Sequence, residues 1–490
     1  MLNKKFLSKI IAFIIILCHL TTIYAAQAEN VTDVDSNWPY YNDKIESKAA
    51  FVMDVDSSKI LYSYNANEKL YPASLTKIMT AIIVLDYVKS NYDDLVTFSY
   101  NAVTRDIDKN SVTIGASAGD QLSVKDCLYS LLLPSANDAA NALAEYVAGS
   151  INDFVLLMND KATQLGLTNT HFVNPSGLHD DNQYSTASDM AKILQYAINY
   201  PIFLQISSSI SYRHAPIRKY KNPENSNNQV LNTNGIMVPG SGYYYNNITS
   251  GKTGHTSLAG YNLAASAKKN NMHLICVVMG AKTDKIRYNE TKSLFDFYFN
   301  NYKSLSIVDT DPRFTNPVNT MEINNVDLIK GLNITCNSNA HLTLPSYVDF
   351  NDVTSKISFQ VEDIYNKYAI GTITYYYENR EVAKCTLEGR NTENNESIFT
   401  GHLDLSKPLN DTDDYIDLSN NNDKNNTNAL IYVNSSGTIV FSSTLITIFV
   451  IILLLVLIIA LIVTFYIFII NNDDIPIRKA VMRLRRRFRR

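Results

Sequence analysis

One stretch near the C-terminus constrains the structure of this chain more than any other. Residues 444–470 contain no charged side chain and consist almost wholly of Ile, Leu, Val and Phe. A helix of about 20 apolar residues crosses a hydrocarbon core of ~30 Å, so this run is long enough to cross with some tilt. We therefore predict a single C-terminal transmembrane helix at residues 444–470.

A basic tail follows this apolar stretch. Eight Lys and Arg residues lie between residues 475 and 490. A cluster of this kind beside a membrane helix stays on the cytoplasmic side, and it also suits contact with anionic lipid headgroups. Residues 471–490 are therefore predicted to form a basic cytoplasmic tail, which either sets the topology alone or also binds anionic lipids of the membrane.

The N-terminus has the three parts of a secretory signal. Three lysines lie within the first nine residues, Ile10–Leu17 form an apolar centre, and residues 26–28 place small side chains at a cleavage site. We expect residues 1–28 to be a signal peptide; an uncleaved anchor helix is the alternative. Cys18 follows a bulky leucine, which argues against a lipidated cysteine. With a cleaved signal, residues 29–443 would lie outside the cytoplasmic membrane.

The formal net charge of the whole chain is −4, and the segment between these basic ends is acidic. Affinity for phosphate groups comes from Lys and Arg, so no nucleic acid is expected as a partner. The cysteines after the N-terminal run fit no metal-binding spacing, and no metal is expected. They are Cys127, Cys276, Cys336 and Cys385. We expect isolated buried thiols, and a Cys336–Cys385 bridge remains open.

Strand and helix patterns alternate in a first block, residues 29–304. Strand patterns occur at 49–55, 60–64, 258–267 and 272–280, and helical patterns at 75–89, 124–133, 137–148, 154–165 and 186–199. Strands, then helices, then strands predict a sheet with helices packed on it. Ser185 is a candidate cap of the last of these helices.

The next two segments differ from the first block. Residues 305–402 contain β-forming runs at 356–361, 370–377 and 382–387, which predict a small all-β domain. Residues 403–443 are rich in Asn, Asp and Ser and poor in large apolar side chains. Such a composition buries too little surface to order itself, so we predict a disordered tether between the β domain and the membrane.

Ser74 and Lys77 form the first motif that contains candidate catalytic residues. They begin a helical pattern, and positions i and i+3 share a helix face, so the amine can reach the hydroxyl. A serine hydroxyl is a weak nucleophile until a base takes its proton, and a lysine serves only where desolvation and neighbouring cations lower its pKa. The helix N-terminus also favours developing negative charge. Ser74 is the candidate nucleophile and Lys77 the candidate base.

Two further motifs follow in the same block. Ser135 and Asn137, spaced by one residue, lie between two helical stretches; the hydroxyl suits proton transfer to a leaving amine, and the amide suits holding a substrate backbone. Lys252, Thr253 and Gly254 stand ahead of a strand pattern. The lysine and threonine suit a substrate carboxylate, and the glycine is expected to let substrate approach the strand edge.

Singly these motifs are common by chance, but the ordered triple occurs in penicillin-binding proteins and class A β-lactamases. The chain resembles the low-molecular-mass penicillin-binding proteins, specifically the D-alanyl-D-alanine carboxypeptidases of peptidase family S11. The similar segments are 71–80, 133–140, 172–178, 184–189, 251–261 and 370–373. The resemblance covers about residues 45 to 400 and implies an α/β (α+β) catalytic domain of the serine β-lactamase/transpeptidase type.

The resemblance also implies a reaction. Ser74 would attack the penultimate D-alanine carbonyl of a peptidoglycan stem peptide ending in D-Ala-D-Ala, with Lys77 as base. The backbone N–H groups of Ser74 and His255 would form the oxyanion hole. The terminal D-alanine would leave, and water would hydrolyse the acyl-enzyme. β-Lactams would acylate Ser74 as inhibitors, and no cofactor is implied. Many members end in an amphipathic helix, so the apolar span here departs from the family pattern.

Other functions remain open on the same residues. A class A β-lactamase would need a deacylating glutamate, and residues 171–184 contain none. A D,D-endopeptidase acting on crosslinks would use the same machinery. A catalytically silent wall-binding protein is a further alternative, which the intact motifs speak against. A Ser-His-Asp triad through His255 is disfavoured because Lys77 already fills the role of base; His171, His179 and His214 are expected to be loop or packing residues.

Overall fold

The computed structural model describes residues 38–107, 111–219, 221, 226–315 and, with internal gaps, 322–391, together with two short strands beyond them. The predicted signal peptide (1–28), transmembrane helix (444–470) and basic tail (471–490) lie outside the described residues. In the part of the chain that is described, no helix combines the length and the apolar character that crossing a bilayer needs. The chain divides into two units, 1–400 and 401–490.

A five-stranded antiparallel sheet forms the centre of the first block, with strand order β2-β1-β9-β8-β7. Its strands are β1 (Ala49–Asp54), β2 (Ile60–Tyr64), β7 (Ile248–Thr256), β8 (Gly260–Lys269) and β9 (Met272–Ala281). Strand β1 pairs with β9, with Phe51 opposite Val277. The sheet therefore joins the two ends of the block, and β7 is left as an edge strand.

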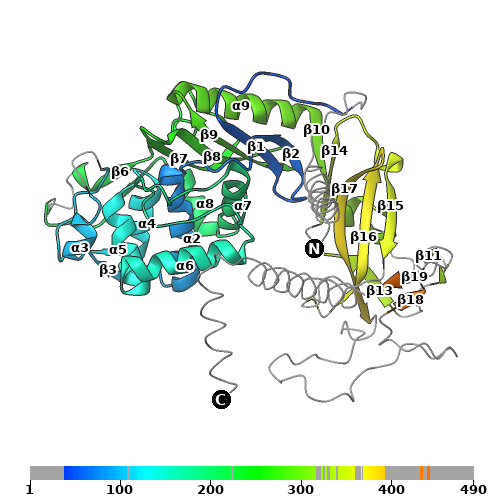
Figure 1. Ribbon diagram of the computed structural model, residues 1–490, viewed down its shortest axis with the longest axis horizontal. Coiled ribbons are helices and arrows are strands. Elements are labelled where there is room, and N and C mark those ends of the chain that lie inside the picture. The colour runs from blue at the N-terminus through cyan, green and yellow to red at the C-terminus, as the bar shows by residue number, and fades with distance from the viewer. Residues whose placement is uncertain are drawn as a thin grey trace, which may run out of the picture. The chain divides into compact units, whose positions relative to one another are not determined.

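Each face of this sheet supports its own apolar core. Because successive strand residues point to opposite faces, Val52 and Val278 belong to one cluster while Phe51 and Val277 belong to the other. Helix α9 (Asp284–Asn301) packs against the first face. Figure 1 shows α9 on one side of the sheet and the remaining helices of the block on the other.

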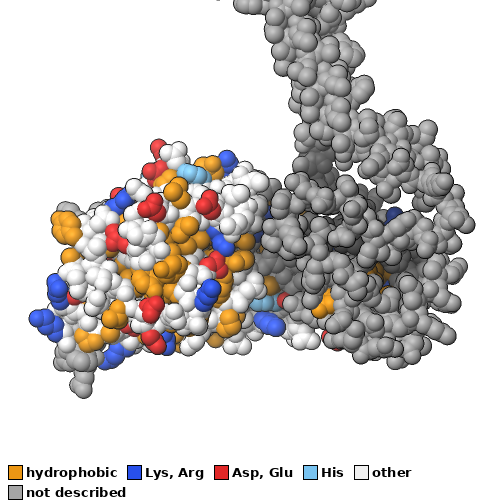
Figure 2. Space-filling view, turned by 90° about the horizontal axis from the view of Figure 1, so that it is seen from below, with side chains coloured by type: hydrophobic (Ala, Val, Ile, Leu, Met, Phe, Trp, Pro, Cys, Tyr) orange, Lys and Arg blue, Asp and Glu red, His pale blue; other side chains and the backbone are white. Residues whose placement is uncertain are grey.

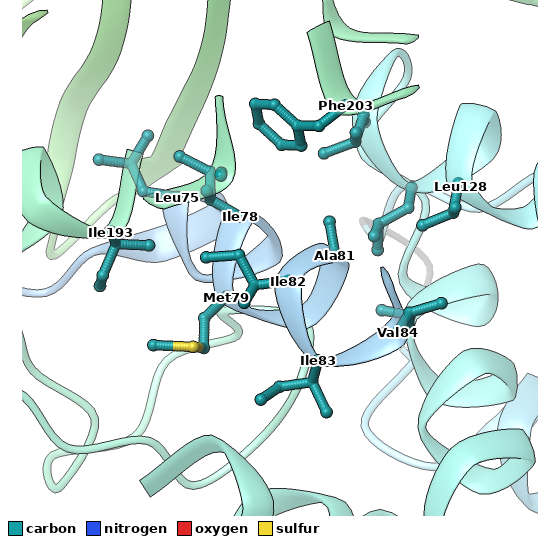
Figure 3. Packing of buried hydrophobic residues seen from close by; sticks show 14 of the residues in the cluster. Leu75, Ile78, Met79, Ala81, Ile82, Ile83, Val84, Leu128, Ile193 and Phe203 are labelled. Carbon is teal, nitrogen blue, oxygen red and sulfur yellow. The ribbon is translucent and has the colours of Figure 1, made fainter. Parts of the chain in front are cut away.

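The second face is covered by helices that come from the middle of the block. They are α2 (Thr76–Val88), α3 (Tyr100–Thr104), α4 (Val124–Leu132), α5 (Asn137–Ala148), α6 (Ile151–Gln164), α7 (Ala187–Ala197) and α8 (Pro201–Ser208). Helix α2 is buried over most of its surface. Figure 3 shows its apolar side chains radiating toward Leu128, Ile193 and Phe203 from other elements. A helix that is apolar all round is typical of a protein core. Helix α2 therefore gives firm support to the side chains at its N-terminal end.

Side-chain caps precede α3, α4, α6, α7 and α9, and the cap of α7 differs from the expectation. The N-cap of α7 is Thr186, whose side chain accepts a hydrogen bond from the N–H of Asp189. The expectation that Ser185 caps this helix is therefore wrong. Ser185 is buried, and its hydroxyl pairs with that of Thr170 at 2.9 Å.

In the segment after the first block, strands lie over the three predicted β-forming runs, and short helices accompany them. Strand β10 (Tyr302–Ser306) pairs with β14 (His341–Pro345). A four-stranded sheet has the order β13 (Leu332–Cys336), β17 (Arg380–Asn391), β16 (Ala369–Tyr377) and β15 (Thr354–Ser358). Cys336 and Cys385 are free thiols in this sheet, and the hydrogen bond between them, together with burial, raises the pKa of Cys385. Cys127 and Cys276 are free and buried.

Short elements complete the described chain. They are the pairs β3 (Leu95–Thr97) with β4 (Gln121–Ser123), β5 (Ser211–Arg213) with β6 (Gln229–Leu231) and β11 (Glu322–Ile323) with β12 (Val326–Asp327), and the one-turn helices α10 (Ile307–Thr310) and α11 (Pro312–Thr315). In the unit 401–490, β18 (Ile431–Val433) pairs with β19 (Ile439–Phe441). This pair lies within the segment predicted to be a tether, the rest of which is outside the described residues.

Candidate active site

The predicted nucleophile and base meet at the start of the buried helix α2. Ser74 lies in the one-turn 3-10 helix η1 (Ala73–Leu75), and Lys77 lies in the first turn of α2 directly after it. The Lys77 Nζ lies 3.1 Å from the Ser74 Oγ. Lys77 is fully buried, whereas Ser74 is partly exposed. The i, i+3 spacing therefore brings the amine to a hydroxyl that substrate can still reach.

Two further oxygen atoms surround the Lys77 amine. Its Nζ donates to the Asn137 Oδ1 at 2.8 Å and to the backbone carbonyl of Ser176 at 2.5 Å. Neither acceptor carries a hydrogen, so each takes one of the two N–H bonds of a neutral amine. The remaining lone pair then faces the Ser74 hydroxyl, which is the direction a general base requires.

Electrostatics favour the neutral form of this amine. Burial lowers the pKa of Lys77 well below its ordinary value, and the nearby charge of Lys252 lowers it further, while Asp138 opposes these effects. Asp138 is itself buried and accepts backbone hydrogen bonds from Ile114 and Gly115. The site thus has the desolvation and the neighbouring cation that a lysine base needs.

The second motif lies in the turn between α4 and α5. Ser135 has a φ of 72°, a left-handed conformation that is uncommon for a residue with a side chain and often marks a functional site. Its buried Oγ has no hydrogen-bond partner among the described residues. Asn137, the first residue of α5, uses its oxygen to bind Lys77. The amide therefore orients the base, a contact that the sequence alone did not indicate.

The third motif precedes β8, the strand expected after it, and itself lies inside strand β7, which the sequence analysis did not predict. A Cβ on Gly254 would stand 2.7 Å from the Pro72 carbonyl oxygen and 3.2 Å from the Ser74 nitrogen. The glycine therefore lets the backbone of η1, and not only a substrate, approach the strand. This close contact places the nucleophile turn beside the middle of β7.

Strand β7 carries two ionisable side chains, Lys252 and His255, whose pKa values are lowered. Burial, and then the charge of Arg287, lower the pKa of Lys252 to about 7. The same two causes lower the pKa of His255. The His255 ring lies 4.1 Å from that of Tyr261, whereas the Ser74 hydroxyl is bonded by Lys77. The lysine, and not the histidine, is therefore the ionisable group that the structure shows bonded to the Ser74 hydroxyl.

Residues that the sequence analysis missed tie these parts together. The Asn262 Nδ2 on β8 donates to the carbonyls of Tyr71 and Pro72 at 2.9 and 3.1 Å. The Arg287 Nη1 on α9 donates to the carbonyls of Gly254 and Asn262 at 3.2 and 3.0 Å. Asn262 directly follows one of the segments similar to the S11 family. Arg287 had no signal, because a single arginine in a polar stretch is typical of an exposed surface.

The described residues contain no group of three or more His, Cys, Asp or Glu side chains placed to hold a metal ion. Figure 2 shows acidic and basic side chains interspersed over the face that it presents. Binding to a nucleic acid backbone depends on clustered Lys and Arg, and this face shows no such cluster.

Comparison with known proteins agrees with this geometry. Residues 36–283 match a family described as D-alanyl-D-alanine carboxypeptidase, peptidase S11. The D-alanyl-D-alanine carboxypeptidase DacF of Bacillus subtilis (strain 168) is 34% identical over 306 residues, which are 61% of this chain and 72% of the relative. DacC of Escherichia coli (strain K12), with the same enzyme name, is 38% identical over 276 residues, 55% of this chain and 65% of the relative.

A solved structure extends the likeness to the fold. Penicillin binding protein 5 from Haemophilus influenzae superposes with a TM-score of 0.56 and 30% sequence identity, over 72% of this chain and 98% of that one. The fold is thus of the penicillin-binding, transpeptidase-like α/β type that the sequence predicted. On these grounds the chain belongs to the D-alanyl-D-alanine carboxypeptidase family of serine peptidases, peptidase family S11.

Proposed function

We propose that this chain is a D,D-carboxypeptidase that removes the terminal D-alanine from peptidoglycan stem pentapeptides through an acyl-enzyme on Ser74. The observation that carries the proposal is the environment of Lys77, a fully buried amine 3.1 Å from the Ser74 hydroxyl. Two acceptors without hydrogens hold its N–H bonds, and burial lowers its pKa, which favours the neutral form. Such an arrangement serves to activate a serine for acyl transfer.

Acylation begins when the Ser74 Oγ attacks the carbonyl carbon of the penultimate D-alanine and its proton passes to Lys77. Negative charge then develops on the carbonyl oxygen. The backbone N–H groups of Ser74 and His255 stabilise that charge, which is usually the largest contribution in acyl transfer. The close approach of Gly254 to the Ser74 nitrogen supports this role, because it puts the nucleophile turn next to this part of β7.

The leaving D-alanine needs a proton on its amine and a binding site for its carboxylate. The unpartnered Ser135 hydroxyl relays the proton from the Lys77 ammonium to the departing nitrogen. Lys252 and Thr253 on β7 bind the carboxylate, the lysine by charge and the threonine by a hydrogen bond. Water then hydrolyses the ester, with Lys77 again as base. A β-lactam reacts as a mimic of the dipeptide and acylates the same hydroxyl.

The test is D-alanine release from a pentapeptide ending in D-Ala-D-Ala, using the full chain in detergent and its Ser74→Ala variant. We expect release by the wild type and none by the variant. Absence of release with intact penicillin labelling at Ser74 would reject the carboxypeptidase and favour an endopeptidase, which crosslinked fragments would reveal. Absence of both would favour a silent wall-binding protein, and rapid turnover of nitrocefin would favour a β-lactamase.

We further propose that the protein is held in the cytoplasmic membrane by residues 444–470. The catalytic domain would then lie outside the membrane and residues 471–490 inside, against anionic lipids. The support is the sequence itself: an uncharged apolar run followed by eight basic residues.

A further inference from the structure

The second acceptor of the Lys77 amine, besides Asn137, belongs to a loop that none of the three motifs includes. The loop, residues 172–178, carries the Ser176 carbonyl that lies 2.5 Å from the Lys77 Nζ. A lysine amine rotates freely about its last bond unless its hydrogens are held. With Asn137 as the one remaining acceptor, the amine could turn its lone pair away from Ser74. The placement of the Ser176 carbonyl therefore decides where the base points.

Asn174 shapes this loop from within. Its Oδ1 accepts hydrogen bonds from the N–H groups of Ser176 at 3.2 Å and Gly177 at 2.7 Å, and its Nδ2 donates to the Leu178 carbonyl at 2.9 Å. Asn174 is 8% exposed. These bonds fix the peptide units on both sides of Ser176, so they set the direction of its carbonyl.

Gln183 in turn holds Asn174 against α2. Its Oε1 accepts from the N–H groups of Val173 at 3.0 Å and Asn174 at 2.9 Å. Its Nε2 lies 3.3 Å from the Asn174 Oδ1 and 3.4 Å from the Thr76 Oγ1 at the start of α2. Gln183 is 2% exposed. A buried amide with all these partners is well ordered, and its loss would leave several backbone groups unsatisfied.

The loop has little freedom to compensate for a lost amide. The Thr80 Oγ1 on α2 donates to the Pro175 carbonyl at 2.6 Å. A Cβ on Gly177 would stand 1.9 Å from the Ala73 carbonyl oxygen, so the loop backbone lies flush against the turn that carries the nucleophile. Small shifts of residues 175–177 are therefore transmitted directly to Ser74 and Lys77.

The network is made of neutral amides, which has a chemical consequence. The charged groups that act on Lys77 are Lys252 from β7 and Asp138 from α5. A carboxylate in place of Asn174 could still accept from the loop N–H groups, but it would stabilise the ammonium form of the base. Amides supply the same hydrogen bonds without stabilising the ammonium form of Lys77, which must be neutral to act as a base.

We propose that Asn174 and Gln183 are positioning residues, which hold the Ser176 carbonyl on the Lys77 amine and so aim its lone pair at the Ser74 hydroxyl. The inference rests on the proposed function, because it assigns Lys77 the role of base. Neither residue touches the reacting atoms; both act through the loop 172–178.

The test is the rate of Ser74 acylation by a fluorescent penicillin, followed from pH 5 to 10 in the full chain. We expect Asn174→Ala to lower the rate at the pH plateau about 10- to 100-fold, since misplacement by about 1 Å costs this much. We expect Asn174→Asp to move the acidic limb of the profile to higher pH, because its charge raises the pKa of Lys77. A role in folding alone would not move that limb.

Asn159→Ala is the matched control. The Asn159 amide holds the other end of the same loop, through bonds of 2.9 Å to the Phe172 N–H and carbonyl, and its hydrogen bonds do not include Asn174. We expect it to lower the melting temperature while leaving the acylation rate within about threefold of the wild type, as an effect on stability alone would.

Three results would overturn the inference: an unchanged plateau in Asn174→Ala, an unmoved limb in Asn174→Asp, or an equal loss of rate in Asn159→Ala. Failure of the proposed function gives a different pattern. If the wild type is acylated normally but releases no D-alanine, carboxypeptidase activity is rejected and the positioning role is still decided by the acylation profiles. A wild type that is never acylated overturns both.

Discussion

Lys252 gives the site a pH dependence that can be measured. Burial and the charge of Arg287 lower its pKa to about 7 in the free protein. In the proposed mechanism the protonated form binds the substrate carboxylate, so kcat/KM for D-alanine release should fall as the pH rises above about 7. In the complex the carboxylate favours the charged lysine and raises its pKa, so kcat should hold to higher pH. Steady-state kinetics between pH 6 and 9 would check this.

The Lys252→Gln variant separates this explanation from others. It should lose the limb near pH 7 and have a lower kcat/KM, because the neutral amide supplies no charge to the carboxylate. Its acidic limb should move to higher pH, since Lys252 is one of the groups that lower the pKa of Lys77. A variant that keeps the limb near pH 7 would show that another group causes it.

The two residues of the first motif illustrate what spacing can predict. A separation of three residues on a helix is a local property, so the contact between Ser74 and Lys77 followed from the sequence. The other two hydrogen-bond partners of the Lys77 amine could not be predicted from the sequence. The Asn137 oxygen and the Ser176 carbonyl come from segments 60 and 99 residues away, and only the tertiary structure brings them to the lysine.

At the scale of elements, two glycines with similar backbone conformations make contrasting predictions. Gly149 ends α5 with a φ of 76°, and a Cβ there would meet no atom within 4 Å. Gly177 has a φ of 84°, and a Cβ there would collide with the Ala73 carbonyl. We expect Gly149→Ala to cost about 1 kcal/mol of stability, from backbone strain alone, and to leave penicillin labelling intact.

We expect Gly177→Ala to abolish penicillin labelling of Ser74, because the loop can accept a side chain only by moving away from the nucleophile turn. Its melting temperature should also fall further than that of Gly149→Ala. Thermal unfolding and gel-based labelling of both variants would measure these effects side by side. Equal labelling by the two would contradict the close approach.

Helix α9 shows where element prediction failed. The strand patterns and the helices α2, α4, α5, α6 and α7 were predicted close to their observed bounds, because their apolar periodicity is clear. Helix α9 contains many polar residues and was not predicted. It buries Arg287, Tyr288 and Tyr298 against the sheet, and such side chains combine apolar bulk with polar tips that find partners only in the folded protein.

Within the described part of residues 1–400, specific contacts join the strands that follow the first block to that block. The Thr343 Oγ1 on β14 donates to the buried Asp54 Oδ2 at the end of β1, at 2.8 Å. Trp38, the one tryptophan of the sequence, lies with its ring 6.3 Å from that of Tyr302 and 5.7 Å from that of Tyr377. Its fluorescence is therefore a natural probe of this junction.

For the whole molecule, the membrane proposal makes a simple prediction. After alkaline extraction of bacterial membranes, the full chain should remain in the pellet, because an apolar run of this length partitions into hydrocarbon. A chain that ends at Ser443 should appear in the soluble fraction and still react with penicillin, which serves as the control for folding. Retention of the shortened chain in the pellet would contradict anchoring by residues 444–470.

The sequence by itself determined the family, because three short motifs in order, each a local property, carry the resemblance. The same motifs predicted the candidate site residues Ser74, Lys77, Ser135, Asn137 and Lys252. The placement of these groups was decided by the tertiary structure. Strands from both ends of the block form one sheet, Gly254 accommodates the turn of the nucleophile, and a distant carbonyl orients the base. The reason is physical: burial, pKa and backbone contacts depend on which remote segments fold together, and a local pattern carries no record of those neighbours.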